Sequence, residues 1–188
     1  MSSERRDVIS VLIHDHREVE ELFGKLEAAT PDDGRTRREL TDQVIIELVR
    51  HSVAEEMYLY PATRKFVPDG DEIADREIAE HSEAEKTMKA LEKTDADTQE
   101  FSGLLAELMT DVRLHIRDEE ERLFPALADH ASPEELTELG EKVQSAKRRA
   151  PTRPHPSAPD RPPLNKLLAP GAGMVDRVRD HLSGRGDS

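Results

Sequence analysis

Three histidines on the apolar sides of predicted helices are each followed, four residues later, by a glutamate on the same side. The pairs are His51 with Glu55, His81 with Glu85, and His115 with Glu119. Side chains four residues apart lie on one face of an α-helix, so each pair directs an imidazole and a carboxylate toward the same place. Buried groups of this kind are costly unless they are paired or bind a cation. The repeated spacing therefore predicts helices that pack around a polar interior site.

Apolar residues spaced by threes and fours predict four long amphipathic helices. We expect these helices at about residues 3–28, 36–65, 71–92 and 99–130, with breaks at Thr30 to Gly34 and Val67 to Gly70. In the first helix, His16 lies on the apolar stripe, whereas His14 lies about 160° away around the helix. Pro61 is expected to kink or end the second helix, because proline has no amide hydrogen to donate.

Four helices joined by short breaks predict an all-α fold, an antiparallel up-down-up-down four-helix bundle. Ser132, Pro133 and Glu135 form a helix-starting pattern, which predicts a short fifth helix that ends at about Lys147. We expect residues 1–147 to form the bundle with this fifth helix, and residues 148–188 to form a Pro-rich, basic C-terminal tail.

Two further patterns bear on the organisation of the chain. Within the tail, Met174 to Leu182 has the spacing of one amphipathic helical piece, whose role the sequence does not indicate. Within the bundle, the stretches His51 to Pro61 and His115 to Pro125 are similar to each other. This similarity predicts two related helical hairpins.

The composition restricts the kinds of site and partner. The chain has no cysteine, which excludes disulfides, thiolate metal sites and a cysteine nucleophile. Its net charge is −14, and the acidic body argues against a nucleic-acid partner. No apolar run approaches the roughly 20 residues of a membrane span, and the first residues do not resemble a signal peptide. We therefore expect a cytoplasmic protein without a membrane partner; a protein partner for the tail cannot be identified from the sequence.

The apolar stripes carry eight candidate metal ligands at comparable depth in the bundle. They are His16, His51, Glu55, Tyr58, His81, Glu85, His115 and Glu119. Mixed nitrogen and oxygen donors suit iron or manganese, with zinc as an alternative. Tyr58 lies three residues after Glu55, so its phenol is expected to reach the metal, with core packing as the alternative. Glu85 is either a ligand or a supporting surface carboxylate, while Glu56 and Glu120 are expected on solvated faces.

The same residues resemble the hemerythrin-like, HHE cation-binding family. The resemblance covers about residues 7–130 and is carried by His16 in a His-Asp-His stretch, His51 to Glu55, Glu80-His81, and His115 to Glu119 with Leu-Phe-Pro beyond. It implies a non-haem di-iron centre in a four-helix bundle that reacts with oxygen, nitric oxide or peroxide. Position by position, it implies that Glu55 and Glu119 bridge two iron ions and that His16, His51, His81 and His115 complete the site.

Two departures from the oxygen-carrying members favour redox chemistry over oxygen transport. The third helix has Glu85 where the carriers have a second histidine. The fourth helix has Glu119 and Glu120, four and five residues after His115, whereas the carriers have an aspartate at the fifth position. An anionic ligand in place of a neutral imidazole favours the ferric state. We therefore expect catalase-like peroxide breakdown or nitric oxide handling on two iron ions, with manganese or zinc less favoured.

Two other readings of the sequence stay open. In one, the di-iron centre binds or senses oxygen, nitric oxide or iron without turnover, so that the protein is not an enzyme. In the other, the bundle is free of metal and is stabilised by buried histidine–glutamate pairs.

Overall fold

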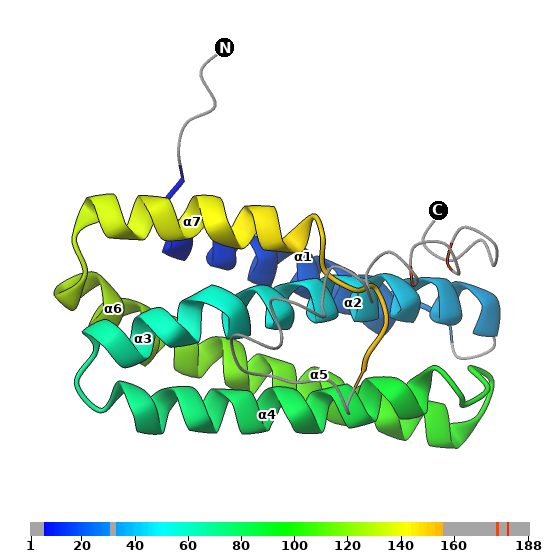
Figure 1. The fold of residues 1–188 in the computed structure, drawn as a ribbon. Coiled ribbons are helices and arrows are strands. Elements are labelled where there is room, and N and C mark those ends of the chain that lie inside the picture. The colour runs from blue at the N-terminus through cyan, green and yellow to red at the C-terminus, as the bar shows by residue number, and fades with distance from the viewer. Residues whose placement is uncertain (1–5, 31–32, 156–175, 177–179, 181–188) are drawn as a thin grey trace, which may run out of the picture.

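The computed structural model describes residues 6–30, 33–155, 176 and 180, which form a helical bundle (Figure 1). Its elements, in chain order, are α1 (Val8–Ala28), α2 (Gly34–Ala54), the π-helical turn η1 (Glu55–Leu59), α3 (Tyr60–Phe66), α4 (Gly70–Leu91), α5 (Gln99–Asp118), the π-helical turn η2 (Glu119–Leu123), α6 (Phe124–His130) and α7 (Pro133–Lys147). No β-strand occurs among these described residues. The prediction of an all-α helical bundle is confirmed.

Each long helix packs against its neighbour in the chain. α1 packs against α2, α3 packs against α4, and α4 packs against α5, so that two layers face each other across the interior (Figure 1). α7 is the predicted fifth helix, and it lies over α1 and α2. The side chain of Ser132 accepts a hydrogen bond from the Glu135 amide, and the Glu135 carboxylate accepts one from the Ser132 amide. This reciprocal cap fixes where α7 begins.

The helix boundaries differ from the predicted ones at the first helix and at the two prolines. α1 begins at Val8 rather than near residue 3, because Asp7 is its cap and accepts a hydrogen bond from the Ser10 amide at 2.8 Å. Pro61 and Pro125 do not end their helices. Each lies in the first turn of an α-helical segment that follows a π-helical turn. A proline at this position needs no amide hydrogen, so the helix continues past it.

The two π-helical turns occupy equivalent places in the two halves of the bundle. In η1, the Tyr60 amide donates to the Glu55 carbonyl, and in η2 the Phe124 amide donates to the Glu119 carbonyl. A π-helical turn contains one residue more than an α-helical turn, so residues five apart come to share a face. The same order of α-helix, π-helical turn and α-helix in both halves agrees with two related hairpins.

Buried apolar residues form two clusters, one toward each end of the bundle. The first contains Leu12, Leu59, Ile78 and Leu123, and the second contains Phe23, Val49, Met88 and Val112, with other buried residues. Each of α1, α2 and α4 contributes to both clusters, and a buried histidine separates the two contributions. On α5, His115 likewise follows Val112 and precedes the first cluster's residues in η2. The four histidines therefore lie at the middle of the bundle.

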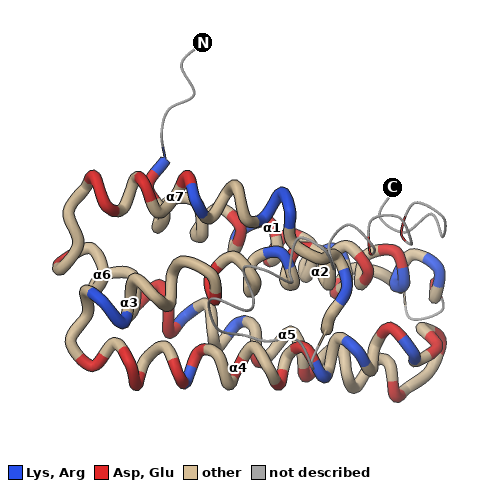
Figure 2. The backbone as a smooth tube through the Cα atoms, in the orientation of Figure 1, with Lys and Arg blue, Asp and Glu red and all other residues tan. Residues whose placement is uncertain are grey.

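Acidic and basic residues both occur along the long helices of the bundle (Figure 2). Among the described residues, none of the helices is both long and apolar enough to cross a bilayer. Beyond α7, the described chain continues to His155. The amphipathic piece predicted at Met174 to Leu182 lies outside the described residues, apart from Asp176 and Asp180.

Candidate metal centre

Four buried histidines meet in the middle of the bundle, one from each long helix. They are His16 of α1, His51 of α2, His81 of α4 and His115 of α5, whose exposed fractions are 2%, 5%, 5% and 9%. The ring centroids of His16 and His51 are 5.0 Å apart, and those of His81 and His115 are 4.8 Å apart. The structure thus brings all four predicted histidines together, as two pairs.

Two fully buried glutamates, Glu55 and Glu119, join one histidine pair to the other. Glu55 places Oε1 3.1 Å from Nε2 of His51 and Oε2 3.5 Å from Nε2 of His81. Glu119 places Oε2 3.4 Å from Nε2 of His16 and 3.7 Å from Nε2 of His115. Each carboxylate therefore contacts a histidine of both pairs, and each comes from a π-helical turn.

Among the residues that the structure describes, three overlapping groups of donor atoms are compact enough to hold a cation, with all atoms of a group within 4.8 Å of one another. The groups are His16, His51, Glu55 and Glu119; Glu55, His81 and His115; and Glu77, His115 and Glu119. Four buried atoms in these groups make no well-directed hydrogen bond, although an imidazole nitrogen or a carboxylate oxygen lies 3.0 to 3.4 Å from each: Nε2 of His16, Oε1 of Glu55, Oε2 of Glu77 and Oε2 of Glu119. Such atoms are costly in an interior, and a bound cation satisfies them. The residues present fit bound metal ions.

An outer ring of carboxylates holds the Nδ1 atom of every histidine. The distances are 2.9 Å from His16 to Glu120, 3.4 Å from His51 to Asp15, 3.2 Å from His81 to Glu56, and 3.0 and 3.1 Å from His115 to Glu77 and Glu80. A carboxylate at Nδ1 fixes the tautomer and directs Nε2 to the interior, as is usual for metal-binding histidines. The prediction that Glu56 and Glu120 lie on solvated faces is wrong, since their side chains are only 13% and 22% exposed.

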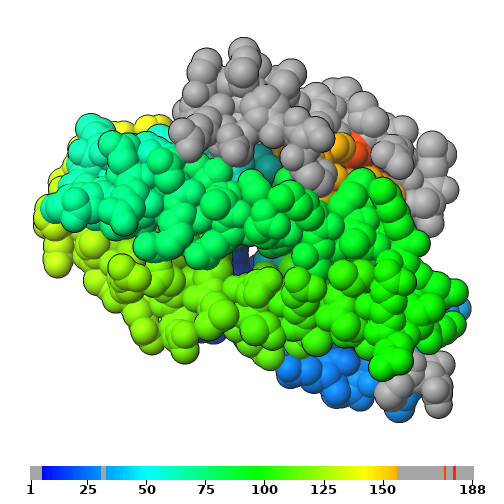
Figure 3. All heavy atoms as spheres, turned by 90° about the horizontal axis from the view of Figure 1, so that it is seen from below, coloured from blue at the N-terminus to red at the C-terminus, as the bar shows by residue number. Residues whose placement is uncertain are grey.

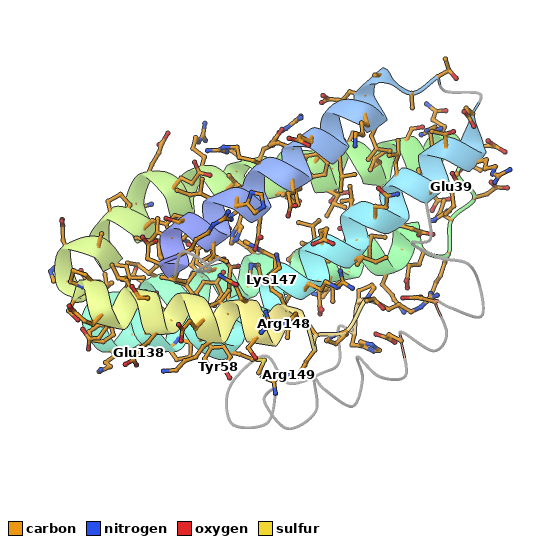
Figure 4. All side chains as sticks on the ribbon, turned by 90° about the horizontal axis from the view of Figure 1, so that it is seen from above. Glu39, Tyr58, Glu138, Lys147, Arg148 and Arg149 are labelled. Atoms are coloured by element: carbon orange, nitrogen blue, oxygen red, sulfur yellow. The ribbon has the colours of Figure 1, made fainter. Side chains whose placement is uncertain are left out.

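The tyrosine at the centre is Tyr60, not Tyr58. The Tyr60 side chain is fully buried, with its hydroxyl 3.1 Å from Nε2 of His81 and 3.4 Å from oxygens of both Glu55 and Glu119. Tyr58 is half-buried against the first apolar cluster, at the edge of the bundle beside α7 (Figure 4). The α-helical spacing places Tyr58 on the face of Glu55, but the π-helical turn brings the residue five positions on to that face.

The extra carboxylate at the centre is Glu77, not Glu85. Glu77 lies one turn before His81 on the same face of α4, is fully buried, and belongs to a donor group with His115. Glu85 lies one turn after His81, is half-buried, and belongs to none of the three groups. Its charge instead acts on His155, whose pKa is raised mainly by the hydrogen bond to Asp176 and to a smaller extent by Glu85.

Histidines in the centre have strongly shifted pKa values. Burial alone lowers the pKa of His51, but the charges of Glu55 and Asp15 outweigh burial and raise this pKa to about 10. The same balance of burial against neighbouring carboxylates, Glu119 above all, raises the pKa of His115 well above its ordinary value. The pKa of His81 is well below its ordinary value because of burial and the charge of His115.

The acidic groups are shifted in opposite directions. Burial and repulsion by Glu119 raise the pKa of Glu55. For Glu119, the attraction of His115 and His16 outweighs burial and lowers the pKa to about 2. Burial and the charges of Glu55 and Glu119 raise the pKa of Tyr60 well above its ordinary value, so the phenol keeps its proton. Opposed shifts among groups in contact are typical of functional sites.

A cavity of about 910 Å³ connects the centre with the surface between α4 and α5. The four histidines are among its lining residues, together with apolar side chains of the second cluster such as Val19 and Met88. Figure 3 shows the opening between α4 and α5, with atoms of the N-terminal helix visible through it. Leu114, 49% exposed, lies at this face. A small molecule can therefore reach the histidines through this opening.

Comparison with known proteins agrees with this site. A family model described as the hemerythrin HHE cation binding domain matches residues 7–127. An uncharacterized hemerythrin-like protein of Schizosaccharomyces pombe is 31% identical over 176 residues, which cover 93% of this chain and 86% of that protein. A DNA nickase of Nostoc is 30% identical over 149 residues, or 77% of this chain, and the match spans 41% of the nickase.

A solved structure shows the same fold. It is the crystal structure of a hemerythrin HHE cation binding domain-containing protein from Mycobacterium kansasii, which is 24% identical. The two superimpose with a TM-score of 0.66, and the match covers 76% of this chain and 86% of that one.

Proposed function

The chain belongs to the hemerythrin HHE cation-binding domain family, and we propose that it is a non-haem di-iron protein that turns over hydrogen peroxide or nitric oxide. One observation supports this most directly. Each of four inward Nε2 atoms is backed by a carboxylate at Nδ1, while Glu55 and Glu119 span the two histidine pairs. This mixed nitrogen and oxygen donor set suits iron or manganese better than zinc.

The residues divide naturally between two ions. His16 and His51 would hold one ion, and His81 and His115 the other, with Glu55 and Glu119 shared and Glu77 on the side of His115. Bound iron would cycle between two oxidation states, and would thereby transfer electrons from one peroxide molecule to another, or from an external reductant to nitric oxide. The protein would supply a buried environment that excludes bulk water. The substrate would enter between α4 and α5 and would reach the side of His81 and His115 first.

Tyr60 is the polar group best placed to assist a substrate at this centre. Its hydroxyl lies within 3.4 Å of Glu55 and Glu119 and 3.1 Å from His81. Because burial and the carboxylates keep the phenol protonated in the metal-free protein, it can donate a hydrogen bond to an oxygen atom in this space. We assign it the role of holding that proton and of orienting the two shared glutamates.

Turnover is favoured over reversible oxygen transport by the number of buried carboxylates. The sequence suggested Glu85 as the additional anionic group, but Glu77 is the better candidate, because it is fully buried and adds negative charge behind His115, 3.0 Å from its Nδ1. Anionic donors stabilise the ferric state relative to the ferrous state, whereas an oxygen carrier must return to the ferrous state in every cycle. The centre is therefore better suited to a reaction in which peroxide or an external reductant restores the ferrous state than to one in which the ferrous state must return spontaneously as oxygen leaves.

The test is the metal content and activity of the purified full chain. We expect two irons per chain, oxygen evolution from hydrogen peroxide or consumption of nitric oxide, and a loss of iron and activity of at least about tenfold in His51→Ala and in Glu55→Ala. His14→Ala is the matched control, since His14 is 56% exposed and contacts Glu18.

Three results would speak against the proposal in different ways. Zinc alone would indicate a structural site. Two irons without turnover would make the protein a binding or sensing protein for oxygen, nitric oxide or iron. Reversible oxygen binding over many cycles without oxidation would indicate that the protein is an oxygen carrier.

A further inference from the structure

The two histidine pairs come from related hairpins, but the charges behind them differ. Behind the pair formed by His16 and His51, each outer carboxylate is matched by a cation. Oδ1 of Asp15 lies 2.5 Å from Nζ of Lys147. Oε2 of Glu120 lies 2.6 Å from a guanidinium nitrogen of Arg17. The negative charge behind this pair is therefore compensated.

Behind His115 the charge is different. Two carboxylates, Glu77 and Glu80, lie 3.0 and 3.1 Å from its Nδ1. Arg76 is 2.8 Å from Glu77, but the same guanidinium nitrogen is 2.5 Å from Asp118 on α5. The other oxygen of Asp118 lies 2.8 Å from Arg122, so two guanidinium groups face three carboxylates, and negative charge remains on this side of the centre.

Lys147 differs from the other charged residues at the site in where it comes from. It is the last residue of α7, which lies beyond the residues 7–127 that match the family model. Its side chain is only 17% exposed. Figure 4 shows Lys147 at the end of α7, next to α1. The fifth helix therefore extends a charge to the carboxylate that holds His51.

We propose that Lys147 is a positioning residue that makes the two metal positions unequal, by weakening the position of His16 and His51 relative to that of His81 and His115. This inference rests on the proposed two-metal function. A carboxylate at Nδ1 makes the imidazole a stronger donor to a cation at Nε2. Lys147 compensates part of the negative charge of Asp15, so His51 becomes a weaker donor to a cation than His115.

The test is an anaerobic titration of the metal-free full chain with Fe²⁺, followed by calorimetry. We expect two resolved binding steps in the wild type. Lys147→Met should tighten the weaker step about tenfold and leave the tighter step within about twofold. Lys147→Arg keeps the charge and should behave as the wild type. Lys142→Met is the matched control, because Lys142 lies on the same helix, is 55% exposed and lies 3.8 Å from Glu138, away from the centre.

A second variant shows whether Lys147 acts through Asp15 or only through the docking of α7. Asp15→Asn should weaken the same step that Lys147→Met tightens, and in the Asp15→Asn background Lys147→Met should have less than a twofold further effect. An equal change in both steps, or an undiminished effect of Lys147→Met in that background, overturns the inference.

The wild-type titration separates this inference from the function on which it rests. Two indistinguishable steps overturn the inference and leave the di-iron proposal intact. Fewer than two ions per chain overturn the proposed function and this inference together.

Discussion

Each histidine of the centre has two nitrogens with different partners. At His81, Nδ1 lies 3.2 Å from Glu56, and Nε2 lies 3.1 Å from the Tyr60 hydroxyl. A neutral imidazole that donates from Nδ1 to a carboxylate has its lone pair on Nε2, which is the form that binds a metal. In the metal-free protein that lone pair can accept the hydrogen bond of Tyr60. The Tyr60 hydroxyl therefore lies on the side of His81 on which Nε2 would bind a metal ion.

Replacement of Tyr60 by phenylalanine tests this role, because it removes the hydroxyl and keeps the ring. We expect Tyr60→Phe to change the absorption spectrum of the iron-loaded protein and to weaken iron binding about tenfold, since Glu55 and Glu119 lose a shared donor. Tyr58→Phe, two residues earlier in η1, is the control and should leave both quantities unchanged. A visible band that disappears in Tyr58→Phe and persists in Tyr60→Phe would contradict the assignment.

At the level of the helices, the α-helical period was enough to find part of the site. It identified all four histidines together with Glu55 and Glu119, because the histidines lie in regular α-helices and the two glutamates are the first residues of the π-helical turns. The same period predicted that the Tyr58 phenol reaches the metal. Because η1 contains one extra residue, Tyr60 rather than Tyr58 lies on the face of Glu55. The similarity of Leu59-Tyr60-Pro61 to Leu123-Phe124-Pro125 was visible in the sequence, but a π-helical turn has no residue pattern that the period reveals.

The choice between Glu77 and Glu85 was beyond the sequence for a different reason. Both lie four residues from His81 on the same face of α4, so the period does not distinguish them. Which one reaches the centre depends on where α5 crosses α4, and His115 lies on the side of Glu77. Most of the outer carboxylates could have been found from the sequence, because they are the acidic residues directly next to His16, His81, Glu55 and Glu119.

The contact between α7 and the start of α1 depends on Gly140. A Cβ atom at this position would lie 2.4 Å from the Arg6 carbonyl oxygen and 2.9 Å from the Asp7 carbonyl carbon. Gly140→Ala must therefore push the two helices apart, and we expect it to lower the free energy of unfolding by about 2 kcal/mol. Urea denaturation of the full chain measures this change.

Gly24→Ala and Gly103→Ala are the controls for this substitution. Neither new Cβ would meet an atom within 4 Å, so both should be neutral or stabilise the protein by up to about 1 kcal/mol. An unchanged or increased stability of Gly140→Ala would show that α7 is not held against α1 in this way.

For the whole molecule, the centre interrupts an otherwise continuous core. The two apolar clusters lie on either side of four imidazoles and three fully buried glutamates. Ionised groups in an interior are tolerated when opposite charges or a cation compensate them, and removal of one partner is strongly destabilising. The stability of the whole bundle should therefore depend on what the centre binds, because every long helix contributes to it.

Metal removal should make this dependence visible as a pH dependence. In the metal-free protein the pKa of His51 is raised from 6.5 to about 10, so between these pH values the native state holds a proton that the unfolded state has lost. Stability should then be lost as the pH rises, by about 3 kcal/mol between pH 6.5 and pH 9 from His51 alone. The raised pKa values of His115 and Glu55 act in the same direction, while the lowered pKa of Glu119 matters only below about pH 4.5. Urea unfolding at pH 6.5 and 9, before and after iron loading, measures the effect.

The iron-loaded protein provides the contrast. A metal-bound histidine gives up the proton concerned, so the loaded protein should be more stable at pH 9 than the metal-free one and should change little between the two pH values. In metal-free His51→Gln, the loss between pH 6.5 and 9 should be smaller than in the wild type, because this substitution removes one of the titrating groups. A metal-free wild type whose stability stays constant or rises over this interval would show that the buried imidazoles do not carry the charge assigned to them.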